Sequence, residues 1–168
     1  MDDPDRERRF LALLNANLAA LGRLAGSYAG STGEREDLVQ DIALALWQAL
    51  PRFRGESSER TFLFRIAHNH CIDHITRRRP VSSLQELEID PVDGARSIET
   101  TLTDQQDSAR LMDAVRRLPM IQRQVVSLAL EDMDYAEIAA VLGISENNVG
   151  VRLNRARAGL RKLMGETS

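Results

Sequence analysis

The sequence lacks the features that mark secreted and membrane proteins. Its single cysteine, Cys71, excludes an internal disulfide and favours a reducing compartment. No uninterrupted apolar run approaches the roughly 18 residues of a membrane-spanning helix. The N-terminal segment MDDPDRERRF also lacks the apolar core of a signal peptide. We therefore expect a soluble, cytoplasmic protein.

Aromatic residues and strand patterns are scarce as well. Phe, Trp and Tyr make up 4% of the 168 residues, so the core must be aliphatic. Polar and apolar residues nowhere alternate as they do in a half-buried strand, and strong helix formers such as Ala, Leu, Arg and Glu are abundant. These properties predict an all-α protein.

Charge is segregated along the chain. The formal net charge is −3, but the segment Val81–Asp107 alone has a local net charge of −6. From Val149 onward, five basic residues against Glu166 give a local net charge of +4, and Arg77–Arg79 form a second basic cluster. Such segregation suits phosphate contacts despite the negative total.

Helical periodicity appears on both sides of the acidic segment. It predicts helices over residues 6–24, 34–50, 61–79, 107–118, 119–130, 135–142 and 146–164. Ser31 and Glu34 have the spacing of a capping box, and Pro51 ends the second helix. We predict two small helical domains, 1–80 and 107–168, joined by a flexible acidic linker over 81–106 with at most short helical pieces.

The C-terminal domain contains YAEIAAVLGISENNVGVRLNRAR, whose spacing predicts a helix-turn-helix. Ala139 is the small residue that lets the second helix approach, Gly143 can take the left-handed conformation of the turn, and Val149 is the apolar residue that anchors the second helix. Ser145 is a favourable N-cap for that helix. The alternative is a plain helical hairpin with a solvated basic face. The candidate DNA-contacting residues are Ser145, Glu146, Asn147, Asn148, Arg152, Asn154, Arg155 and Arg157.

The helix over residues 34–50 has two distinct sides at about 100° per residue. One side is aliphatic and must be core. The opposite side is polar and acidic, which is commonly a solvated face, but it includes one leucine, and a leucine among acids suits a protein-docking surface. This docking stripe consists of Asp37, Gln40, Asp41, Leu44 and Gln48.

The helix TFLFRIAHNHCIDHITRRR also has two faces. The expected core face contains Phe62, Leu63, Ile66, Ala67, His70 and His74, and we expect His68 to point elsewhere. Arg65, Asn69, Ile72 and Thr76 line another face that runs into the arginine cluster, which suits contact with a nucleic-acid strand. His70, Cys71 and His74 could converge on a metal. Because the two histidines fall on the apolar stripe, we predict packed core histidines and no metal.

Three segments, in order, resemble the extracytoplasmic-function sigma factors. EDLVQDIALALW is similar to that family's polymerase-docking segment. In TFLFRIAHNHCIDHITRRR, similar to its minus-ten helix, Leu63, Ile66, Ala67, Asn69 and Asp73 match the family pattern. LPMIQRQVVSLALEDMDYAEIAAVLGIS…RARAGLRKL is similar to the domain that reads the minus-thirty-five element. Three departures stand out: Phe62 for tryptophan, Asn148 for threonine and Gly150 for a basic residue.

The resemblance implies an alternative sigma factor that binds core RNA polymerase and directs promoter-specific initiation. The docking stripe would contact the β′ clamp helices, with β as a further contact, and the helix-turn-helix would read the minus-thirty-five element. An anti-sigma factor is an expected partner. The residues implied at the minus-ten element are Arg54, Glu56, Ser57, Ser58, Arg60, Arg65, Asn69, Thr76, Arg77, Arg78 and Arg79.

Two other functions are compatible with parts of the sequence. A stand-alone helix-turn-helix regulator would use the N-terminal domain as a sensor or dimerisation unit. A metal-dependent enzyme would use His70, Cys71 and His74. No paired carboxylates, Gly-rich phosphate loop or nucleophile motif supports an enzyme, so we predict no catalytic residue, no cofactor and no small-molecule substrate.

Overall fold

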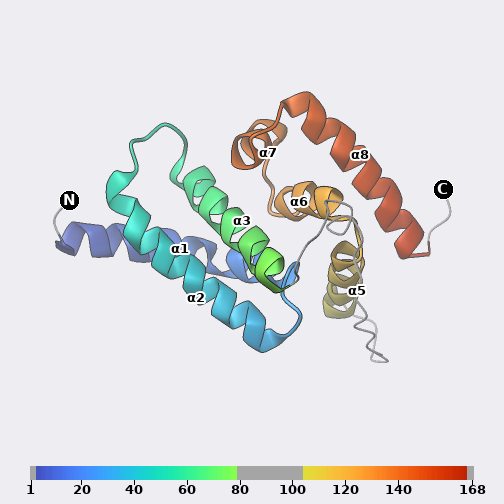
Figure 1. The fold of residues 1–168 in the computed structure, drawn as a ribbon, viewed down its shortest axis with the longest axis horizontal. Coiled ribbons are helices and arrows are strands. Elements are labelled where there is room, and N and C mark those ends of the chain that lie inside the picture. Colours follow the sequence, from blue (N-terminus) through green and yellow to red (C-terminus); the bar gives the residue numbers. More distant parts are fainter. Residues whose placement is uncertain (1–2, 79–103, 166–168) are drawn as a thin grey trace. The chain divides into compact units, whose positions relative to one another are not determined.

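The computed structural model describes residues 3–78 and 104–165, whose regular structure is entirely helical (Figure 1). This confirms the expected all-α class. The chain forms two compact units. Among the described residues, the first contains the three N-terminal α-helices and the segment Ala140–Gly143. The second contains the remaining C-terminal residues.

The first unit is built around its second helix. α1 (Asp3–Gly26), α2 (Thr32–Ala49) and α3 (Glu59–Arg78) all pack against one another, with the short 3₁₀ helix η1 (Leu50–Arg52) after α2. Their core is largely aliphatic, as the composition predicts, with Tyr28 and Phe64 as buried aromatic residues. The fully buried large side chains here are Leu21, Leu24, Ile42, Leu46, Leu50, Leu63 and Phe64.

The second unit packs its last helix against two earlier ones. α8 (Glu146–Leu163) contacts α5 (Asp104–Arg116) and α6 (Met120–Ala129), while α7 (Tyr135–Leu142) precedes α8 in the chain. The fully buried large side chains are again aliphatic: Val115, Leu118, Leu128, Ile138 and Leu153.

Local capping signals explain where several helices begin. The Ser31 hydroxyl accepts a hydrogen bond from the Glu34 amide (3.1 Å), so the predicted cap of α2 is confirmed. α7 has a reciprocal capping box, in which the Asp134 amide donates to the Glu137 carboxylate and the Glu137 amide to that of Asp134. This Asp-x-x-Glu signature is present in the sequence, although it was not among the predicted caps.

One leucine of α1 is exposed although its spacing matches that of buried residues. Leu18 shares the helical spacing of Phe10, Leu13 and Leu21, but it is 46% exposed, whereas Leu13 and Leu21 are buried. The core of the first unit covers a narrower stripe of α1 than the periodicity predicts. The buried stripe takes in Ala20 and Asn17, whose side-chain amide donates a hydrogen bond to the Leu13 carbonyl (2.9 Å).

The predicted domain limits stay a prediction, because most of the segment between the two units lies outside the described residues. The linker prediction for residues 81–106 and Arg79 fall largely there. α5 begins at Asp104, three residues before the predicted start at Asp107. Of the described helices, none combines the length and apolarity that a membrane crossing requires.

Gly159 of α8 lies so close to Leu118 that we expect its replacement by alanine to lower the stability of the protein. A Cβ added at Gly159 would lie 2.9 Å from Cδ2 of Leu118, which is itself buried. We expect Gly159→Ala to destabilise the protein by about 1–3 kcal/mol through overpacking, more than the gain of up to about 1 kcal/mol in helix propensity. Urea unfolding followed by circular dichroism would measure this.

Gly22→Ala in α1 is the matched control, because nothing lies within 4 Å of a Cβ at that position. It should be neutral or stabilising. Equal effects of the two substitutions would contradict the close approach of α8 to Leu118.

Candidate protein-docking and nucleic-acid interfaces

The polar side of α2 is exposed along the helix. Leu38, Ile42 and Leu46 are buried, which turns the opposite side outward. Leu44 is 57% exposed, the most exposed of the large apolar side chains among the described residues. All five residues of the docking stripe are exposed: Asp37, Gln40, Asp41, Leu44 and Gln48. The stripe therefore combines two carboxylates with one accessible leucine.

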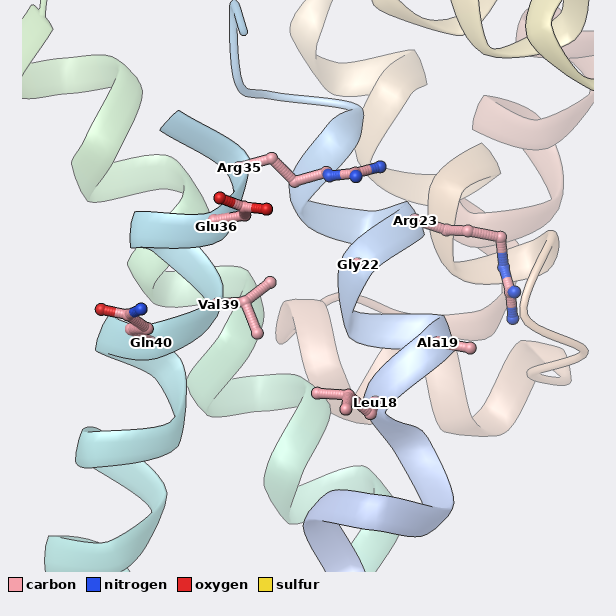
Figure 2. A pocket seen from close by; sticks show the side chains of 8 residues that line it. All are labelled: Leu18, Ala19, Gly22, Arg23, Arg35, Glu36, Val39 and Gln40. Carbon is pink, nitrogen blue, oxygen red and sulfur yellow. The ribbon is translucent and has the colours of Figure 1, made fainter. Parts of the chain in front are cut away.

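An open hollow between α1 and α2 borders this stripe (Figure 2). Leu18 from α1 and Val39 from α2 point toward one another across it, and Gln40 belongs to both the hollow and the docking stripe. Arg23 and Arg35 contribute positive charge to its lining. The exposed Leu18 is therefore part of the wall of this hollow.

Aromatic and basic side chains hold the first helix against the connection between α2 and α3. The Arg6 guanidinium lies 3.9 Å from the centre of the Trp47 ring, and Phe10 contacts the same ring edge-on at 5.3 Å. Arg9 forms an ion pair with Glu59, at the start of α3. This cluster was not anticipated, because its members are distant in the sequence.

The loop before α3 is anchored at both ends. Phe53 and Phe62 pack with ring centres 4.8 Å apart, so the two ends of the loop meet. Ser58 caps α3, its hydroxyl accepting a hydrogen bond from the Thr61 amide (3.0 Å), and Gly55 has a positive φ of 77°. The loop residues expected at the minus-ten element are exposed at Arg54, Glu56 and Ser58 and half-buried at Ser57.

The outer face of α3 is polar and basic. Arg65, Asn69, Thr76 and Arg77 are exposed. Arg60 is half-buried, and its guanidinium lies 5.2 Å from the centre of the Phe64 ring. Arg78 is the last residue of α3, and Arg79 lies outside the described residues.

The buried face of α3 differs from our prediction. His68 is buried, whereas His70 and His74 are only half-buried, as are Phe62 and Ile66. His74 instead contacts the Glu34 carboxylate (3.1 Å), which links α3 to the start of α2. The prediction that His70 and His74 are the core histidines is therefore wrong. The side chains that do face the core, in addition to Leu63 and Ala67, are Phe64, His68, Cys71 and Ile75.

Burial also determines the ionisation of this face. It lowers the pKa of His68 to about 4 and raises that of the Cys71 thiol well above its usual range. The Cys71 sulfur is therefore neither ionised nor accessible near neutral pH. Among the described residues, no three His, Cys, Asp or Glu side chains converge as metal ligands.

The local features predicted for the helix-turn-helix are present. Gly143 has a φ of 72°, the left-handed conformation that the turn requires. Ser145 caps α8, its hydroxyl accepting a hydrogen bond from the Asn148 amide (3.1 Å). Val149 is fully buried, together with Leu153 and Ala156, so one side of α8 faces the core.

The opposite side of α8 presents the predicted DNA-contacting residues. Arg152 is half-buried. The exposed ones are Ser145, Glu146, Asn147, Asn148, Asn154, Arg155 and Arg157. Gly150, a departure from the family pattern, has a packing role: a Cβ there would lie 3.2 Å from Cε2 of Tyr135. The sequence did not reveal this contact, because it joins two different helices.

An all-helical chain with a helix-turn-helix, an outward basic helix and an exposed acidic stripe defines a DNA-binding transcription factor. The Sigma-70 region 2 family matches residues 13–81, and the Sigma-70 region 4 family matches residues 108–160. The sequence is 31% identical over 147 residues to the ECF RNA polymerase sigma factor SigM of Mycobacterium tuberculosis, covering 86% of this chain and 71% of SigM. It is also 31% identical over 171 residues to the RNA polymerase sigma factor CnrH of Cupriavidus metallidurans, covering 96% and 90%.

Solved structures agree with these relatives. CnrH in complex with the cytosolic domain of CnrY has a TM-score of 0.71 and 30% identity, covering 96% of this chain and 91% of CnrH. RpoE in complex with the anti-sigma factor NepR from Bartonella quintana has a TM-score of 0.69 and 25% identity, covering 96% and 97%. The chain belongs to the extracytoplasmic-function sigma factor family. It is an alternative sigma factor that directs transcription initiation, which sets the stand-alone regulator aside.

The buried imidazole of His68 predicts a loss of stability in mild acid. Within the described part of the chain, its Nδ1 atom has no hydrogen-bond partner. Because burial lowers the folded-state pKa from 6.5 to about 4, the unfolded chain binds a proton more readily below pH 6.5. The contribution of neutral His68 to the stability of the fold is therefore complete above pH 6.5, and it is lost as the pH falls toward 4. We expect the free energy of unfolding to fall by about 2 kcal/mol between pH 7 and pH 5 because of His68.

Urea unfolding at pH 7 and 5 would test this expectation on wild type and two variants. His68→Gln should lose that part of the pH dependence, and the half-buried control His70→Gln should keep it. A pH dependence unchanged in His68→Gln would contradict the assignment.

Proposed function

We propose that this sigma factor docks on the β′ clamp helices of core RNA polymerase through the α2 stripe, with β as a further contact. The observation that supports this most directly is Leu44, 57% exposed and flanked by the exposed carboxylates of Asp37 and Asp41. An apolar contact inside a charged rim is typical of a protein interface.

We further propose that the loop before α3 and the outer face of α3 recognise and melt the minus-ten element. The loop is exposed at its tip but fixed at its base by Phe53 and Phe62, a suitable arrangement for holding an extruded base. Flipping a base costs a few kcal/mol, which stacking and nearby arginines can offset. Asn69 lies exposed on the adjoining helix, and Arg77 is exposed near its end. We propose that Arg77 and the neighbouring Arg78 contact duplex phosphates.

The third proposed contact is between α8 and the minus-thirty-five element. In a helix-turn-helix, the N-terminal residues of the second helix reach base edges, and here Ser145 places Glu146, Asn147 and Asn148 in the first turn. Arg152, Arg155 and Arg157 lie farther along and are suited to flanking phosphates or bases. The promoter therefore contacts two separate basic surfaces.

Regulation by an anti-sigma factor follows from the same exposed surfaces. Solved relatives are described in complexes with the cytosolic domain of CnrY and with NepR. We propose that an anti-sigma factor also binds this chain and covers its docking stripe, because masking Leu44 and its carboxylates would block polymerase binding. The protein acts in the cytoplasm with the polymerase. It contributes no catalytic residue and no small-molecule site, since phosphoryl transfer belongs to the core enzyme.

Charge reversal on the docking stripe tests the first contact. Asp37→Arg combined with Asp41→Arg should abolish co-elution with core polymerase, because it places two positive charges beside Leu44. The fold should persist, since both side chains are exposed. Gel filtration with core enzyme measures binding, and circular dichroism checks the fold.

The charge-matched control is Glu7→Arg combined with Asp107→Arg, both exposed and outside the stripe. It should bind core polymerase normally. Core binding by the Asp37/Asp41 variant would show that the stripe is not the docking surface.

Removing basic groups from α8 tests the third contact. Arg152→Ala combined with Arg155→Ala should weaken promoter binding by the holoenzyme. It should also reduce the slope of log K against log salt concentration by about one for each phosphate that an arginine no longer neutralises. Binding titrations at several salt concentrations would measure both quantities.

The control for this experiment is Arg110→Ala, an exposed arginine of α5 outside the recognition helix. Its salt slope should equal that of the wild type. An unchanged slope in the double variant would exclude a phosphate role for Arg152 and Arg155.

A further inference from the structure

The outermost side of the recognition helix α8 is uncharged. Val149, Leu153 and Ala156 face the core, so the residues diametrically opposite are the ones that enter a DNA groove most deeply. At helical spacing these are Asn147, Val151, Asn154 and Ala158, all exposed.

Val151 is the large apolar residue on this exposed side of α8. It is 38% exposed on a helix whose core contacts are provided by other residues. A solvated position would be filled equally well by a polar helix former. An exposed β-branched side chain at the centre of a DNA-reading surface instead suits direct contact with an apolar group of the DNA.

The surface beside Val151 is also apolar, because Tyr135 packs over Gly150. A Cβ at position 150 would meet Cε2 of Tyr135 at 3.2 Å, and the Tyr135 side chain is itself partly accessible, at 41% for the residue. A larger residue at position 150 would therefore crowd the tyrosine ring.

We propose that Val151 contacts the 5-methyl group of a thymine in the upstream promoter element, and that Asn147 and Asn148 read neighbouring adenines. In the major groove, the thymine methyl is the only apolar group on a base edge, and asparagine pairs in bidentate fashion with N6 and N7 of adenine. The upstream element is therefore read as adjacent A·T pairs in the first two turns of α8. This inference rests on the proposed reading of that element by α8.

The first experiment uses holoenzyme, assembled from core polymerase and the full chain, on a promoter library with a randomised upstream window. Promoter-dependent starts establish that this region of the DNA is read, and their absence would refute the proposed function itself. Among active templates, we expect enrichment of adjacent A·T pairs. Enrichment of G·C pairs throughout the window, with initiation intact, would overturn only the present inference.

The second experiment removes a single methyl group. In an enriched template, each thymine is replaced in turn by deoxyuridine, which keeps the hydrogen-bonding edge. One position should lose about four-fold in promoter binding, the value expected for burial of one methyl group. Val151→Ala should show the same loss on the thymine template and no further loss with deoxyuridine.

Ile121→Ala is the matched control, because Ile121 is a similarly exposed aliphatic residue on α6. It should retain the four-fold sensitivity to deoxyuridine. Sensitivity that persists in Val151→Ala, or that is absent at every thymine in the wild type, would refute the contact.

Discussion

Which side of α2 and which side of α8 is buried is the constraint on which the docking stripe and the DNA-reading surface both depend. Each helix buries one narrow aliphatic stripe, Leu38, Ile42 and Leu46 in α2 and Val149, Leu153 and Ala156 in α8. A serine hydroxyl caps each helix and fixes where it begins. With the start and the buried side both determined, no freedom remains in which residues face outward, so functional specificity is a direct consequence of packing.

Sequence periodicity predicted the positions of the helices well, but it predicted the buried face of α3 incorrectly. In α3, Phe62, Ile66 and His70 are spaced four apart and form a plausible apolar stripe, yet Phe64, His68, Cys71 and Ile75 are buried instead. Both sets satisfy helical spacing, and only the shape of the surface formed by α1 and α2 chooses between them. Histidine hydropathy cannot resolve this, because the imidazole is tolerated in either environment at the cost of a shifted pKa.

Contacts between helices were the other information that the sequence could not supply. Gly150 read alone is a weak helix former that lacks a basic side chain, and only the position of Tyr135 reveals that the space is occupied. By contrast, Gly143, Ser145 and Val149 were predictable, since the turn, the cap and the buried anchor are local properties of a short segment. The candidate site could therefore be located from the sequence, while the chemical character of its surface required the packing.

Opposite charges on neighbouring helices can interact with different partners, because the electric field of each charge is short-ranged. At physiological ionic strength the screening length is about 8 Å, so the carboxylates of Asp37 and Asp41 act chiefly on what α2 touches, and the arginines of α3 on what α3 touches. A chain with a net charge of −3 can bind DNA for this reason. Its acidic stripe need not weaken phosphate binding by α3 or α8, provided that the exposed sides of these helices point to different partners. The one-sided burial of each helix leaves such a side exposed on α2, α3 and α8 alike.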